Sequence, residues 1–250
     1  MQHPKYIIPN TFTSLNMLIG FSSIYASLNG DFITAGWLIM LSMIMDKLDG
    51  TMARLFKASS MFGVEFDSFS DFVSFGFAPA MLTLNYFKGD VSWSSADMLY
   101  LNAGLAFYVL LAAMRLAKYN ALDSDNHEYF SGLTSTQSGA LIAAWFVTAL
   151  EYKLPGLLTP RILTGMLFIH GILMVLPFKY SKLKPQKSPI LNILQVLIMG
   201  GIGVLILIRE FPFILYGVGV SYLVVGTLLM WKENHAAIGR AADPIESTDE

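Results

Sequence analysis

The feature that most constrains this chain is a succession of apolar stretches, each about long enough to cross a lipid bilayer. A membrane helix needs roughly 20 apolar residues. Eight candidate spans satisfy this in a chain of 250 residues, at 11–29, 32–55, 63–87, 97–118, 134–152, 158–177, 190–209 and 211–231. Only 14% of the residues are charged, against about 25% in soluble proteins. The sequence therefore predicts an all-α integral membrane protein.

The segments between these spans are short, which leaves no room for a soluble second domain. We expect one transmembrane domain over residues 1–233 and a polar, disordered tail over 234–250. The formal net charge of −2 argues against a general nucleic-acid binder. The chain has no cysteine, which excludes disulfides and thiol chemistry.

Four aspartates interrupt this apolar pattern. Asp46 and Asp49 are spaced i, i+3, and Asp67 and Asp71 are spaced i, i+4, so each pair shares a helix face. A turn near 57–61 would let the two faces meet. Four adjacent carboxylates need a cation, and an oxygen-only cluster suits Mg²⁺ or Mn²⁺. The alternative is a set of solvated helix-end charges, which we disfavour because ionisable residues in apolar helices are usually functional.

Small residues lie beside the aspartates. Gly50, Ala53 and Gly63 would let a bulky ligand approach the helix backbones. Arg54, one turn after Gly50, is placed to meet a phosphate. The sequence thus indicates a site for a phosphate-bearing ligand at the metal.

Residues 46–71 read D-x2-D-G-x2-A-R-x8-G-x3-D-x3-D. This pattern resembles the signature of the CDP-alcohol phosphotransferases, integral membrane enzymes of phospholipid synthesis. The continuation S-F-S-D-F-V-S-F-G-F-A-P-A is similar to the CDP-diacylglycerol–serine branch of that family. The resemblance implies a six-helix core over about 1–180, two extra helices over about 188–232, and a homodimer.

The resemblance also implies the reaction. The phosphatidyl group of CDP-diacylglycerol would pass to the hydroxyl of L-serine, giving phosphatidylserine and CMP. Two Mg²⁺ or Mn²⁺ ions would be held by Asp46, Asp49, Asp67 and Asp71. Asp71 would also act as the general base that takes the proton of the serine hydroxyl.

For the nucleotide and the CDP-lipid, the resemblance implies contacts from residues of the first three helices. These are Asn10, Thr13, Asp49, Gly50, Ala53, Arg54, Ser60 and Gly63. Two of them have plain structural alternatives, because Asn10 would be an ordinary N-cap of the first helix and Ser60 could cap the third. Asn16 lies deeper in the membrane and needs a partner, either on a neighbouring helix or in the site.

The acceptor candidates lie at the end of the fourth span. The run R-L-A-K-Y-N from Arg115 is similar to R-L-A-R-F-N of the serine branch. Arg115 or Lys118 would bind the serine carboxylate, for which the guanidinium fork is well suited. The alternative for both residues is positive-inside anchoring. The following loop departs from F-x-G-L-P-x-P of that branch by having Thr134 and Thr136 in place of its prolines.

Lysine and arginine set the expected orientation. With eight spans, twelve of the sixteen Lys and Arg residues fall on the side of the two termini. We therefore predict a multi-pass protein of the cytoplasmic membrane with both termini and the aspartates on the cytoplasmic side. The alternatives to serine transfer are another acceptor (glycerol phosphate, inositol or inositol phosphate), an archaeal-type ether lipid donor, a cation transporter, and an inactive scaffold.

Overall fold

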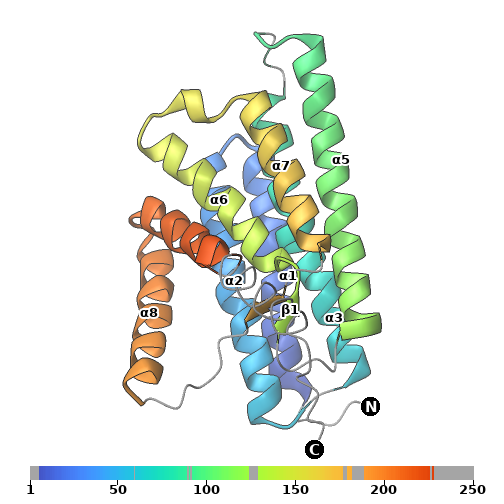
Figure 1. The fold of residues 1–250 in the computed structure, drawn as a ribbon, viewed down its shortest axis with the longest axis vertical. Helices are drawn as coiled ribbons and strands as arrows, with labels where there is room; N and C mark the ends of the chain where they lie inside the picture. The colour runs from blue at the N-terminus through green and yellow to red at the C-terminus, as the bar shows by residue number, and fades with distance from the viewer. Residues whose placement is uncertain are drawn as a thin grey trace, which may run out of the picture.

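The computed structural model describes residues 6–58, 60–88, 90, 92–123, 129–176, 179–181, 189–225 and 227, and these are helical almost throughout (Figure 1). The α-helices are α1 (Ile7–Leu28), α2 (Phe32–Leu55), α3 (Met61–Asp71), α4 (Ala78–Phe87), α5 (Ser95–Lys118), α6 (Ser135–Glu151), α7 (Pro160–Val175) and α8 (Pro189–Ile208), followed by a last helix at Pro212–Val225. Two π-helical segments, η2 (Phe72–Phe77) and η3 (Tyr119–Asp123), and a 3₁₀ turn, η4 (Pro155–Leu157), complete the helical elements. The prediction of a helical chain is confirmed. The polar tail at 234–250 lies outside the described residues.

The helices form a bundle in which α1 packs along α2 and α5 packs along α7. Figure 1 shows α5 and α7 side by side on one flank and α8 on the opposite flank. The predicted third span is a continuous rod made of α3, η2 and α4. Within the described residues, Ser95–Ala121 is the one helix that meets the length and composition of a membrane span by itself. The apolar helices Pro160–Val175, Asn192–Ile208 and Pro212–Val225 are shorter.

One element was not predicted. Strands β1 (Tyr129–Ser131) and β2 (Lys179–Ser181) pair in antiparallel register, with Phe130 opposite Tyr180. They join the segment after α5 to the segment after α7. Three residues are too few to give a readable strand pattern in a sequence, which is why the all-α prediction missed them.

The π-helical segment η2 lies at the centre of the bundle. A Cβ atom on Gly20 of α1 would lie 2.7 Å from the Cα of Ser74, and one on Gly139 of α6 would lie 2.8 Å from the Cα of Phe75. Both distances are shorter than real Cβ contacts. Glycine at these two positions therefore lets α1 and α6 close directly onto the backbone of η2.

A proline explains why the rod departs from α-helical geometry here. In an α-helix the carbonyl of Phe75 would accept from the N–H of residue 79. Residue 79 is proline, which has no N–H and whose ring clashes with the carbonyl four residues earlier. A π-helical turn over Phe72–Phe77 accommodates this conflict. Asp71, the last aspartate of the motif, immediately precedes that turn.

The turn between α2 and α3 is closed by a Schellman motif. The N–H of Ala58 donates to the carbonyl of Ala53 at 2.9 Å, and the N–H of Lys57 donates to that of Arg54 at 3.2 Å. Lys57 has a φ of 48°, a left-handed conformation usually taken by glycine at this position. The motif fixes where the chain reverses between the two pairs of aspartates.

The strain at Lys57 gives a first prediction. Lys57→Gly should stabilise the protein by about 1 kcal/mol, because glycine adopts a left-handed conformation without the clash of a Cβ atom. Thermal unfolding in detergent would measure the change. The matched variant Lys57→Val should be destabilised, since a β-branched residue is least tolerated at positive φ. A less stable Lys57→Gly protein would contradict the prediction.

Candidate active site

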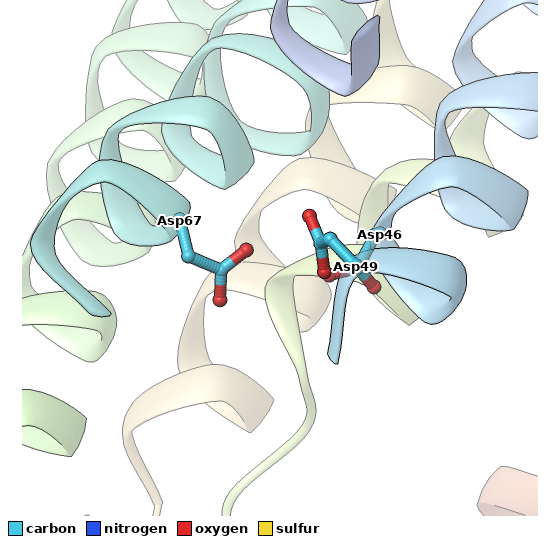
Figure 2. A group of neighbouring side chains, drawn as sticks. All are labelled: Asp46, Asp49 and Asp67. Atoms are coloured by element: carbon cyan, nitrogen blue, oxygen red, sulfur yellow. The ribbon is translucent and has the colours of Figure 1, made fainter. Parts of the chain in front are cut away.

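Three aspartates converge between α2 and α3. Figure 2 shows Asp46 and Asp49 on α2 facing Asp67 on α3. One carboxylate oxygen from each lies within 4.8 Å of those of the other two. The i, i+3 spacing on α2 places two of the groups on one face, and the reversal at the Schellman turn brings the third toward them.

Asp71 adjoins this cluster one helical turn after Asp67. Its side chain is 7% exposed and lies within hydrogen-bonding reach of the Asp46 carboxyl group. Its Oδ1 accepts a hydrogen bond from Nδ2 of Asn16 at 3.3 Å. Asn16 is fully buried. The sequence left open whether Asn16 bonds a neighbouring helix or reaches the site. In the structure its partner is Asp71, a residue of the site.

Serine hydroxyls hold α1 beside these aspartates. Ser70 donates to the carbonyl of Thr13 at 3.0 Å, and Ser74 donates to the carbonyl of Asn16 at 3.0 Å. Ser42 on α2 donates to that same carbonyl at 3.4 Å. Sequence analysis did not single out these serines. The sequence contained a sign of their role, because Ser70 and Ser74 are spaced i, i+4, the same spacing as the neighbouring Asp67 and Asp71.

Two buried oxygens of the cluster lack partners. Asp49 Oδ2 and Asp67 Oδ1 make no hydrogen bond within the described part of the chain. Buried polar atoms are normally paired, and an unpaired buried carboxylate oxygen is costly. A divalent cation would satisfy both atoms, and a donor set made only of oxygens fits Mg²⁺ or Mn²⁺. The residues present therefore fit the predicted metal.

A buried arginine supplies the opposite charge. Arg115 of α5 is 7% exposed and close enough to Asp71, Asp46 and Asp67 to interact with them electrostatically. Its Nη1 donates to Ser135 Oγ at 3.0 Å. Its Nε is buried and has no partner among the described residues. Arg115 thus faces the carboxylates, whereas the other acceptor candidate, Lys118, is half-buried in the last turn of α5.

The start of α6 also reaches the site. Thr136 Oγ1 donates to Asp46 Oδ2 at 3.4 Å. Thr134 caps α6, and its hydroxyl accepts from the N–H of Gln137 at 3.2 Å. The two threonines that stand where the serine branch has prolines therefore both use their hydroxyl groups. Sequence analysis treated them only as departures from a pattern, and it did not single out Ser135.

Several nucleotide candidates meet at the first turn of α3. A Cβ atom on Gly63 would lie 3.1 Å from Ser60 Oγ and 3.7 Å from Asn10 Oδ1, so these three residues adjoin. Thr13 is within hydrogen-bonding reach of Asp49. Ser60 also has the capping role given as its alternative, because its hydroxyl accepts from the N–H of Gly63 at 3.0 Å.

The remaining candidates lie along the outer part of α2. Gly50 is exposed, and a Cβ atom added there would meet nothing within 4 Å. Ala53 is half-buried and Arg54 is exposed. This face of α2 is open for a ligand to approach.

The structural alternative for Asn10, an N-cap of the first helix, is wrong. Helix α1 begins at Ile7 with Tyr6 as its N-cap, so Asn10 lies inside the helix. Pro9 permits this because it falls in the first turn, where backbone N–H groups have no intrahelical acceptor. Asn10 therefore does not have the capping role that was its structural alternative.

Comparison with known proteins defines the class. A sequence model of the CDP-alcohol phosphatidyltransferase family matches residues 6–231, and the chain belongs to this family. It is therefore a transferase.

Three relatives of this chain are named CDP-diacylglycerol–serine O-phosphatidyltransferase. The relative from Helicobacter pylori strain J99 is 32% identical over 197 residues, covering 78% of this chain and 81% of its own. That from H. pylori strain 26695 is 30% identical over 244 residues, covering 94% and 99%. That from Methanocaldococcus jannaschii is 34% identical over 175 residues, covering 70% and 74%.

Proposed function

We propose that this chain transfers the phosphatidyl group of CDP-diacylglycerol to L-serine, giving phosphatidylserine and CMP. The observation that carries the proposal is the group of three carboxylates within 4.8 Å of one another, with unpaired buried oxygens and a buried arginine beside it. Metal ligands and a fixed cation together suit a donor with a pyrophosphate and an acceptor with a carboxylate. The names of the relatives support the same pair of substrates.

Asp46, Asp49, Asp67 and Asp71 would hold two divalent ions, Mg²⁺ or Mn²⁺. When bound, such ions neutralise the charge of a pyrophosphate and of the departing phosphate. The unpaired oxygens of Asp49 and Asp67 support this assignment because they have no other partner in the described structure.

Asp71 is the proposed general base. It takes the proton from the serine hydroxyl while that oxygen forms a bond to the lipid-side phosphorus, and the bond from that phosphorus to the CMP oxygen breaks. The hydrogen bond from Asn16 Nδ2 to Asp71 Oδ1 supports this role. It holds one oxygen of the carboxylate and orients the other for the proton.

Arg115 is the proposed site for the serine carboxylate. Its Nη1 is held by Ser135, while its Nε is buried and unpaired in the described structure. An acceptor carboxylate would provide the missing partner, and a planar guanidinium binds carboxylates in two-point geometry. Lys118 remains a second candidate for the same role, supported only by the similarity of its sequence motif to that of the serine branch.

The nucleotide would lie across the outer face of α2 and the start of α3. The proximity of Asn10, Ser60 and Gly63 supports a pocket wall there, and the open space over Gly50 supports a close approach of the ligand. Thr13, Ala53 and Arg54 complete the proposed contacts, with Arg54 toward a phosphate.

We place the chain in the cytoplasmic membrane as a multi-pass homodimer with its termini and aspartates on the cytoplasmic side. Large apolar side chains that are more than half exposed support burial of the bundle in lipid. They include Leu18, Phe21, Tyr25, Leu99, Leu110, Ile169, Ile193 and Val196. The distribution of lysine and arginine supports the orientation.

The proposal is tested by CMP release from purified protein in detergent with CDP-diacylglycerol and Mn²⁺ or Mg²⁺. We expect release with L-serine and none with glycerol 3-phosphate, inositol or no acceptor. Arg115→Lys should raise the KM for serine more than it lowers kcat, because it keeps the charge but loses the planar fork. Release with another acceptor only would overturn the assignment of serine. Activity restricted to an ether-linked CDP-lipid would instead show that the donor is this lipid and not CDP-diacylglycerol.

A further inference from the structure

A buried chain of polar side chains crosses the bundle from α7 to η2. Tyr108 donates its hydroxyl hydrogen to the carbonyl of Phe75 at 2.7 Å. Ser138 donates to the Tyr108 hydroxyl at 3.2 Å, and Ser138 Oγ lies 3.3 Å from His170 Nδ1. The Ser138 hydroxyl therefore donates toward Tyr108, and the Tyr108 hydroxyl donates to the Phe75 carbonyl, so this pair of hydrogen bonds ends on that carbonyl.

In α-helical geometry the Phe75 carbonyl would have no N–H donor in its own helix. The N–H that an α-helix would offer it belongs to residue 79, and Pro79 has none. Phe75 is fully buried, so water does not replace that donor, and an unpaired buried carbonyl is disfavoured. The Tyr108 hydroxyl, which is also fully buried, meets this need from α5.

The geometry of η2 determines where the aspartates of α3 point. A π-helical turn adds one residue relative to an α-helix, which rotates the helix before it by about 100° relative to the helix after it. Asp71 immediately precedes η2, and Asp67 lies one turn earlier. If the segment relaxed to an α-helix, both carboxylates would turn away from Asp46 and Asp49.

We propose that Tyr108 is a positioning residue for the metal site. Its hydroxyl holds the Phe75 carbonyl in the π-helical segment and so maintains the rotation of α3 that brings Asp67 and Asp71 to the aspartates of α2. The inference rests on the proposed function insofar as the aspartates bind divalent cations. Tyr108 itself contacts neither the ions nor the substrates in this scheme.

The test is Mn²⁺ binding to purified protein in detergent, followed by the electron paramagnetic resonance signal of free Mn²⁺. Tyr108→Phe, which removes only the hydroxyl, should weaken Mn²⁺ binding about 10- to 100-fold, as is typical for residues that orient metal ligands. Excess Mn²⁺ should restore part of the lost CMP release. Ser138→Ala, which leaves Tyr108 in place, should cause a smaller loss in the same direction.

Thr83→Val is the matched control. Thr83 is also fully buried, but its hydroxyl bonds within its own helix, to the carbonyl of Pro79 at 2.9 Å. Its replacement should leave Mn²⁺ affinity unchanged. Unchanged affinity in a folded Tyr108→Phe protein would overturn the proposal. Wild-type protein that binds no Mn²⁺ would overturn both this inference and the proposed metal site.

A double variant separates positioning from simple pairing of a buried carbonyl. Pro79→Ala restores the N–H that Phe75 lacks, so Tyr108→Phe combined with Pro79→Ala should recover thermal stability. We expect Mn²⁺ binding to stay weak in the double variant, because the restored N–H favours the α-helical register. Recovery of both stability and Mn²⁺ affinity would show that Tyr108 serves only to pair the carbonyl, and would overturn the proposal.

Discussion

Asp71→Asn is expected to reduce serine-dependent CMP release by about 10³-fold or more while the protein stays folded. Asparagine keeps the shape of the side chain and a hydrogen-bonding group for Asn16, but it cannot take the proton of the acceptor hydroxyl. General bases contribute about 10²- to 10⁴-fold to catalysis, and this aspartate is also a proposed metal ligand. Initial rates at saturating serine and CDP-diacylglycerol would measure the loss.

The matched control for this loss is Asp97→Asn. Asp97 is a half-buried aspartate in the first turn of α5, where it accepts a hydrogen bond from Nε of the exposed Arg161 at 2.9 Å. Its replacement removes the same charge and should leave the rate within about twofold, because Asp97 lies at the opposite end of α5 from Arg115. Activity of Asp71→Asn close to that of Asp97→Asn would contradict the proposed role of Asp71.

Gly139→Ala is expected to destabilise the protein by about 3 kcal/mol, the upper end of the usual cost of overpacking. Its new Cβ atom would lie 2.8 Å from the Cα of Phe75, and backbone cannot move aside as a flexible side chain can. Displacement of η2 should also reduce activity, because Asp71 precedes this segment. Thermal unfolding in detergent, with and without Mn²⁺, would measure the effect.

Gly165→Ala is a control for which we expect the opposite change in stability. Gly165 also lies inside a helix, α7, but a Cβ atom there would meet nothing within 4 Å. Alanine is favoured over glycine in helices by about 1 kcal/mol, so this variant should be slightly stabilised. Equal effects of the two substitutions would show that the contact between Gly139 and Phe75 does not limit the packing of the bundle.

Local spacing predicted the helices and the aspartate pairs because those features depend on residues close in sequence. Both the i, i+3 pair on α2 and the turn after it are local. The partner of Asn16 was not predictable in the same way, since it depends on how α1 docks against α3. Arg115 and Thr136 likewise reach the site only through the packing of α5 and α6.

The π-helical segment had a signal in the sequence that was not used. Pro79 within a long apolar span indicates an irregularity about one turn earlier. That signal gives the position of the irregularity but not its kind, because a kink and a π-helical turn both accommodate proline. In the folded structure, the hydrogen bond from the N–H of Ala78 to the carbonyl of Val73, five residues earlier, identifies the π-helical turn.

The order of the site residues along the chain has a consequence for synthesis. All four aspartates and Asn16 lie before residue 72, and their contacts join α1, α2 and α3. The short turn between α2 and α3 closes at little entropic cost. The four proposed cation ligands are therefore synthesised before α5 and α6. Those later helices add Arg115, Thr136 and the Tyr108 hydroxyl that bonds the Phe75 carbonyl. A nascent chain halted before α5 would contain the proposed cation ligands without the contact from Tyr108 and without the proposed acceptor residue Arg115.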